Sequence, residues 1–99
     1  MAEITSKVEF KGDVSFLGAA SVRDRLLDAL EKSDIVSVDI GGIKSFDITF
    51  FQTLISAEKT ATDQGKKLTF SSLPNVELIR MAANLGILRP ETADDSWPW

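Results

Sequence analysis

The stretch from Lys44 to Leu54 joins a predicted strand to a predicted helix, and this order constrains the fold more than any other feature of the chain. Before it, residues 35–40 (IVSVDI) are mostly β-branched and apolar, which is typical of an interior strand covered on both faces. From Thr49 to Gln64 the apolar residues recur at helical spacing. Strand-to-helix junctions in α/β proteins commonly carry function, because helix N-termini have unpaired N–H donors and a partial positive charge. We therefore expect the junction to be the functional rim of the molecule.

Local signals within this junction and its helix predict where individual side chains lie. Asp47 is expected to cap the helix, and Thr49 places a hydroxyl in its first turn. Neighbouring helix residues point about 100° apart, so we expect Phe51 in the core and Phe50 near the surface, where it would contact a partner. Gly65 is expected to end the helix in the left-handed conformation. The predicted solvent-facing side carries polar residues: Gln52, Glu58, Lys59 and Asp63.

Strand and helix patterns alternate along the rest of the chain, with turns at Gly12-Asp13 and Gly41-Gly42. The sequence allows two structures for each of two short segments. Residues 14–17 form either a strand or an extended loop, and Ile87-Leu88 either adds an edge strand or simply packs against the rest of the domain. The alternation predicts an α/β fold, a mixed and mostly parallel central sheet of four to five strands packed against helices. The predicted strands are 4–10, 35–40 and 67–71, and the predicted helices are 19–32, 49–64 and 76–85.

The C-terminal residues differ in composition from the rest of the chain. From Arg89 onward the sequence is rich in Pro, Glu, Thr, Asp and Ser. We therefore predict one domain over residues 1–88 and a loosely held tail over residues 89–99. Trp97 and Trp99 either fold back over an exposed edge or engage another protein.

The composition excludes several classes of function. The 99 residues contain no Cys and no His, so disulfides, thiolate–zinc sites and catalytic triads are impossible within the chain. We expect neither catalysis nor a cofactor nor a metal site. The net charge of −4 without a basic run argues against nucleic-acid partners. No apolar run has membrane-spanning length and the N-terminus lacks a signal-peptide pattern, so we expect a cytoplasmic protein without membrane insertion.

At this point an ordered set of short motifs resembles a known family, the STAS domains of bacterial anti-sigma factor antagonists. The resemblance spans most of the chain, and it implies a single STAS-like α/β domain. No single motif is decisive for this resemblance, which depends on the order of the motifs along the chain. The motifs are Gly12-Asp13-Val14, residues 36–40 followed by Gly42-Ile43 and Phe46-Asp47, a helix from near Thr49, residues 64–68 (QGKKL), and Leu85-Gly86-Ile87.

The resemblance implies a non-enzymatic protein-interaction module in bacterial signalling, and first of all an anti-sigma factor antagonist-like partner-switch protein. Antagonists of this family bind a kinase that doubles as an anti-sigma factor, and this kinase phosphorylates a Ser or Thr at the start of the second long helix. Here the position directly after Asp47 holds Ile48, so Thr49 is the candidate phosphoacceptor, and Phe50 replaces a family glycine. The alternative is a STAS subunit without phosphorylation control, in a lipid-transport ABC complex beside its ATPase or in a chemosensory assembly. The implied docking rim consists of Asp13, Ser15, Phe16, Asp47, Ile48, Thr49, Phe50 and Gln52.

Overall fold

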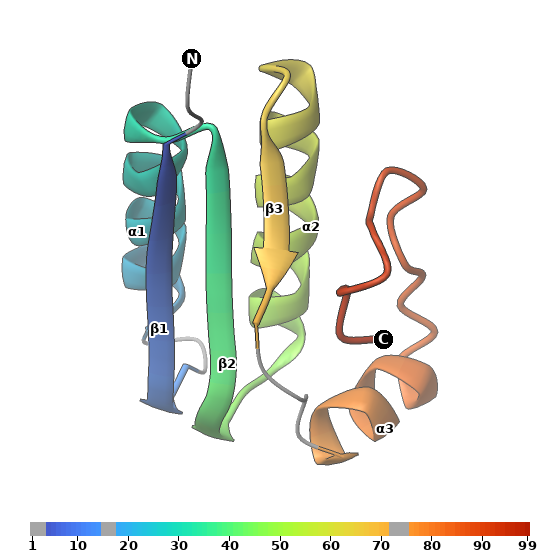
Figure 1. The fold of residues 1–99 in the computed structure, drawn as a ribbon. Helices are drawn as coiled ribbons and strands as arrows, with labels where there is room; N and C mark the ends of the chain where they lie inside the picture. The colour runs from blue at the N-terminus through green and yellow to red at the C-terminus, as the bar shows by residue number, and fades with distance from the viewer. Residues whose placement is uncertain (1–3, 15–17, 72–75) are drawn as a thin grey trace.

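The computed structural model describes residues 4–14, 18–71 and 76–99, and these contain three strands and three helices. They alternate along the chain (Figure 1). None of the helices in these ranges has the length and apolarity of a membrane span. In chain order the elements are β1 (Thr5–Asp13), α1 (Ala19–Lys32), β2 (Ile35–Ser45), α2 (Ile48–Asp63), β3 (Lys67–Phe70) and α3 (Val76–Asn84).

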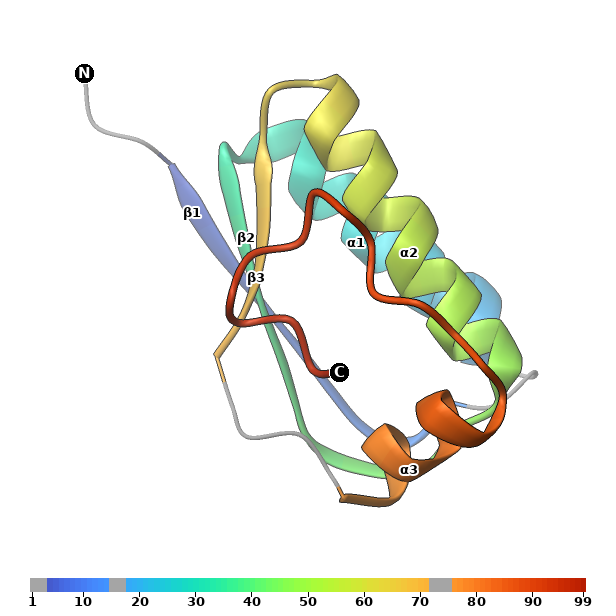
Figure 2. The same ribbon diagram turned by 90° about the vertical axis from the view of Figure 1, so that its right-hand side faces the viewer.

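The sheet is parallel throughout and has the order β1-β2-β3. Because successive strands are neighbours and parallel crossovers are right-handed, α1 and α2 lie on the same face of the sheet. Figure 2 shows both helices on that face and no helix on the other. The fold is therefore α/β with helices covering one face of a parallel sheet.

The predicted number of strands, four to five, is wrong for the described residues, which form three. Ile87-Leu88 does not pair as a strand; Gly86 ends α3 with a φ of 69°, and Ile87 then packs against the core. Val14 lies just outside β1, although its N–H still donates to the Ser45 carbonyl oxygen at 2.7 Å. The remainder of the possible strand at 14–17 falls outside the described residues.

The two residue pairs that predicted turns, Gly12-Asp13 and Gly41-Gly42, lie inside strands instead. β1 continues through Gly12, whose φ of 75° sits at an irregularity of the pairing, and β2 continues through Gly41 and Gly42. Gly42 pairs with Lys11, and a Cβ atom at Gly42 would lie 2.9 Å from the Lys11 Cβ atom. Gly42 thus allows the two strands to approach closely and to continue pairing as far as Asp13 and Ser45.

The core lies between the sheet and the two long helices. Alternate residues of each strand point into it, and the next residues along form the opposite face, where Ser37 and Asp39 of β2 are half-buried. The expectation that β2 is covered on both faces is therefore wrong, because both crossover helices pack on one side. The strand residues in the core are Val8, Phe10, Val36, Val38, Ile40, Ile43, Leu68 and Phe70.

Residues Ile87–Trp99, which we call the C-terminal strap, run back along α2 and β3 without regular secondary structure (Figures 1 and 2). The Trp97 side chain is only 5% exposed and joins the hydrophobic core. Its ring packs edge-on against Phe70, and the Trp99 ring packs edge-on against Phe51. The expectation of a loosely held tail is wrong in this respect, and of the two alternatives for the tryptophans, the structure shows the fold-back over an edge.

Candidate functional site

The carboxyl ends of β1 and β2 meet at one end of the molecule, and α2 begins there. Asp13 pairs with Ser45 in the sheet register, and the Val14–Ser45 hydrogen bond extends this pairing by one residue. Asp13 is exposed at this end, next to the loop that leads into Ile48. Two residues of the predicted docking rim, Ser15 and Phe16, lie outside the described residues.

Asp47 caps α2 as predicted. Its Oδ1 atom accepts hydrogen bonds from the backbone N–H groups of Thr49, at 3.0 Å, and of Phe50, at 3.4 Å. The backbone of Asp47 is extended, as expected for a residue that precedes a helix. The carboxylate also places a negative charge at the positive end of the helix dipole. The cap therefore holds the first turn of α2 in a defined geometry.

The first turn of α2 presents one large apolar side chain to solvent. Ile48 is 46% exposed, and Gln52, four residues on, is exposed on the same face of the helix. Thr49 is half-buried, and its carbonyl oxygen accepts a hydrogen bond from the Thr53 hydroxyl at 2.8 Å. The exposed part of the predicted rim on α2 thus consists of Ile48 and Gln52, with Thr49 partly covered beside them.

Phe50 is buried, so the prediction that it lies near the surface is wrong. Both Phe50 and Phe51 are fully buried, with ring centroids 6.3 Å apart. The reason is that α2 is covered on three sides, by α1, by the sheet and by the C-terminal strap. Phe51 meets the strap through Trp99. A helix with so wide a buried arc can hide two adjacent side chains, and Phe50 is therefore not a partner contact.

Beside the rim, a shallow groove lies between the loop before α2 and helix α3. Apolar residues of a helix are expected on its inner face, but the structure exposes Val76 and Ile79 of α3, by 65% and 39%. The sequence could have indicated this exposure, because the apolar residues of this segment are spread over a wider arc of the helix than one packed face can cover. The groove is lined by Phe46, Glu77, Arg80, Met81, Asn84 and Leu85.

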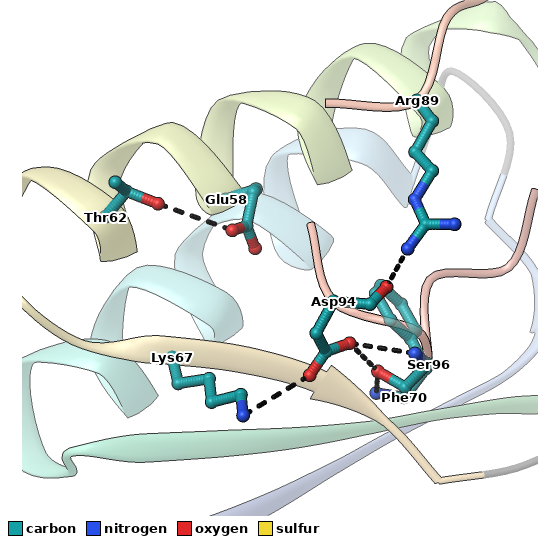
Figure 3. A network of polar contacts seen from close by, with 7 residues as sticks. All are labelled: Glu58, Thr62, Lys67, Phe70, Arg89, Asp94 and Ser96. Carbon is teal, nitrogen blue, oxygen red and sulfur yellow. Dashed lines mark hydrogen bonds and ion pairs between the residues drawn. The ribbon is translucent and has the colours of Figure 1, made fainter. Parts of the chain in front are cut away.

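Glu58 is buried, although the helical pattern placed it among the solvent-facing residues of α2. Its side chain is 4% exposed, and the Thr62 hydroxyl donates to its Oε1 atom at 3.3 Å (Figure 3). Burial raises the pKa of this carboxyl, an effect that hydrogen bonds with Thr92 and Thr62 partly offset. Glu58 lies four residues after Leu54 and three before Ala61, both buried, so this spacing was the available signal.

A cluster of side chains that could bind a metal ion is absent from the part of the chain that the structure describes. No group of three or more Asp or Glu side chains in these ranges is arranged to hold a metal ion. What the site offers chemically is a capped helix start, an exposed isoleucine and an adjacent groove with an apolar floor. This arrangement suits contact with another macromolecule.

Comparison with known proteins identifies the family. Among curated proteins no match is found. The crystal structure of a sulfate transporter family protein from Wolinella succinogenes is similar with a TM-score of 0.62 and 19% identity, covering 83% of this chain and 66% of that one. A structure described as "Crystal Structure Analysis of Mglu" has a TM-score of 0.60 and 16% identity over 69% of this chain and 17% of that one. The chain thus spans less than two thirds of either. A family model described as "Mlab, STAS domain" matches residues 1–89, and the chain therefore belongs to the STAS domain family.

Proposed function

We propose that this chain is a non-enzymatic STAS interaction module that docks onto a protein partner through the end of the molecule where α2 begins. The contact surface would consist of Asp13, Ile48, Thr49 and Gln52, with Asp47 holding the helix start in place. The observation that carries the proposal is the exposure of Ile48. An isoleucine 46% exposed at the first position of a well-capped helix leaves much of its apolar surface in water, and contact with a partner would bury that surface.

The residues at the start of α2 favour a constitutive docking subunit over a phosphorylation switch. The position directly after the cap holds a side chain that cannot accept a phosphoryl group. Thr49 is half-buried, and its N–H is engaged by Asp47. We infer a subunit that stays bound to its partner, as in the lipid-transport ABC complexes or chemosensory assemblies implied by the resemblance.

A second candidate function, anti-sigma factor antagonism, is favoured by one observation. The hydroxyl of Thr49 lies in the first turn of α2, where a phosphate would meet the positive end of the helix dipole. A phosphate there would add nearly two negative charges to the proposed contact surface. The helix would tolerate that charge while the interface lost its complementarity.

Binding to purified candidate partners tests the docking surface. The partners are an ABC-transporter ATPase, a chemosensory protein and an anti-sigma kinase from the same organism. We expect the substitution Ile48→Glu to weaken binding to the true partner at least about tenfold, the effect of losing a contact worth roughly 1.4 kcal/mol. The fold should survive, because an acidic residue in the first turn of a helix is favourable.

Ile4→Glu is the matched control, because Ile4 is also exposed but directly precedes β1, at the opposite end of that strand from Asp13. Equal affinities for Ile48→Glu and Ile4→Glu would overturn the proposed surface. The switch is tested separately, by incubating the chain with the kinase and ATP and locating phosphate by mass spectrometry. Modification that persists unchanged in Thr49→Ala would exclude Thr49 as the acceptor.

A further inference from the structure

Two kinds of favourable contact hold the C-terminal strap against the body of the molecule. The first is aromatic: Trp97 packs on Phe70 with ring centroids 5.0 Å apart, Trp99 packs on Phe51 at 5.1 Å, and the two indoles touch each other at 5.2 Å. All three pairs are edge-on, which is a favoured geometry for aromatic rings. These contacts tie the strap to both β3 and α2.

The second kind of contact is polar and closes the open edge of β3 (Figure 3). The backbone N–H of Phe70 donates to the Ser96 hydroxyl oxygen at 3.0 Å, in the place where a neighbouring strand would supply a carbonyl. Asp94 lies within 3.7 Å of the Lys67 ammonium, and its carbonyl oxygen accepts from Arg89. Side chains of the strap thus cover part of the open edge of the sheet.

Opposing these contacts, three buried polar atoms at the same interface have no hydrogen-bond partner. They are Oε2 of Glu58 and the Nε1 atoms of Trp97 and Trp99. With the strap open, each of these atoms would be free to hydrogen-bond to water, so burying it without a partner when the strap closes is unfavourable. The Glu58 carboxyl carries the largest penalty of the three when it is ionised, because burying a charge is far more unfavourable than burying a neutral group and the hydrogen bonds with Thr62 and Thr92 offset only part of that cost.

We propose that the strap is a reversible latch, which stays closed over α2 and β3 while the Glu58 carboxyl is protonated and is released when that carboxyl ionises. Glu58 lies beneath the strap, close to Thr92 and Asp94. The raised pKa of Glu58 decides in which direction closure of the strap changes with pH. Closure is most favourable below the ordinary pKa of a glutamate, and this advantage is lost as the pH rises through the raised value.

The other charged groups around Glu58 set the lowest pH at which the strap stays firmly closed. Burial alone would raise the pKa of Asp94, but hydrogen bonds from Ser96 and the charge of Lys67 outweigh it and lower the pKa. Asp94 therefore favours closure when ionised, and that contribution is lost only in stronger acid. The strap should be tightest at mildly acidic pH, above the lowered pKa of Asp94 and below the raised pKa of Glu58. The remaining charged groups near it are Lys59 and Asp63 of α2, Lys67 of β3, and Arg89 and Glu91 of the strap.

Tryptophan fluorescence reports on the strap alone, because the chain has two tryptophans, both in the strap, and no tyrosine. Acrylamide quenching is measured against pH, with far-UV circular dichroism as the monitor of the fold. We expect quenching to increase from mildly acidic to neutral pH at constant helix content. Between acid, where Glu58 is protonated, and a pH above its raised pKa, the ratio of closed to open strap should fall about tenfold for each unit by which closure raises that pKa. Glu58→Gln should remain protected across this range, and the control Glu31→Gln, at an exposed position of α1, should behave as wild type.

Amide exchange at two neighbouring residues of the chain gives a second readout. The Phe70 N–H faces the strap, whereas the Ser71 N–H donates to Val38 of β2 at 2.9 Å. Release should reduce protection at Phe70 and leave Ser71 unchanged. A quenching profile that is flat with pH, or that is the same in wild type and Glu58→Gln, would overturn the proposal. Loss of helix content together with the rise in quenching would also overturn it, since the event would then be global unfolding.

Discussion

The Oδ1 atom of Asp47 accepts a hydrogen bond from the backbone N–H of Thr49 at 3.0 Å, so one side chain organises both the start of α2 and the candidate phosphoacceptor. The same contact leaves Ile48, between the two, pointing to solvent. The geometry of the proposed docking surface therefore depends on a single local interaction. Its energetic contribution can be measured directly.

Removing the cap should destabilise the domain by about 1 kcal/mol. Asp47→Ala leaves the first N–H groups of α2 without their acceptor, whereas Asp47→Asn retains a side-chain oxygen in the same position. The free energy of unfolding in urea measures the difference. Equal stabilities of the two variants would show that the cap contributes nothing beyond the helix itself.

Phe50 and Ile48 should respond very differently to truncation, although only Thr49 separates them. Phe50→Ala empties a fully buried position and should lower the free energy of unfolding by about 3–5 kcal/mol. Ile48→Ala removes a largely exposed side chain and should change it by about 0.5 kcal/mol or less. Urea titration of both variants checks this. Similar losses at the two positions would contradict the burial described for the first turn of α2.

Gly42 should be intolerant of any side chain while Lys11 faces it. Because a Cβ atom at Gly42 would lie 2.9 Å from the Lys11 Cβ atom, Gly42→Ala should destabilise the sheet by about 1–3 kcal/mol. Lys11→Gly removes the opposing atom, so the double variant should lose less than the sum of the two single losses. A double-mutant cycle on unfolding free energies measures the coupling. Strict additivity would mean that the strands separate freely at this pair.

While the strap is closed, Asp94 should stabilise the domain when its carboxyl is ionised and not in strong acid. Its pKa is lowered in the folded protein, so its contribution is present above the ordinary pKa of an aspartate and is lost as the pH falls through the lowered value. In the Glu58→Gln background, in which the strap should stay closed, Asp94→Asn should therefore lower the urea midpoint at pH 7 and have progressively less effect in strong acid. The loss should stay below about 1 kcal/mol, because Lys67 is largely solvated. Asp95→Asn, at the exposed neighbouring position, is the control; an equal effect there would contradict the role of Asp94.

Much of the local structure could be predicted because its causes are local. The bounds of α1, at Ala19 and Lys32, were predicted correctly from helical spacing. The Asp47 cap and the left-handed Gly65, with a φ of 69°, follow from the chemistry of single residues. The alternation of strand and helix patterns likewise predicted a mostly parallel sheet, and the three strands are parallel.

The errors share a different cause, which is pairing with distant parts of the chain. Gly41 and Gly42 signal a turn in isolation, yet pairing with β1 keeps them in a strand. Phe50 and Glu58 are buried because α1 and the strap cover faces of α2 that the helix by itself would leave in water. The number of strands depended on whether segments such as Ile87-Leu88 found an edge to pair with, and the strap closed that edge with Ser96 instead.

The sequence by itself determined the order of strands and helices, the capped start of α2 and the family resemblance, because hydrophobic period, capping and turn residues act over a few positions. Only the tertiary structure decided which side chains at that start remain exposed and where the tryptophans lie. Burial is a property of what packs against a residue, and for Ile48, Phe50, Glu58 and Trp97 the covering elements, or their absence, come from segments far away in the chain.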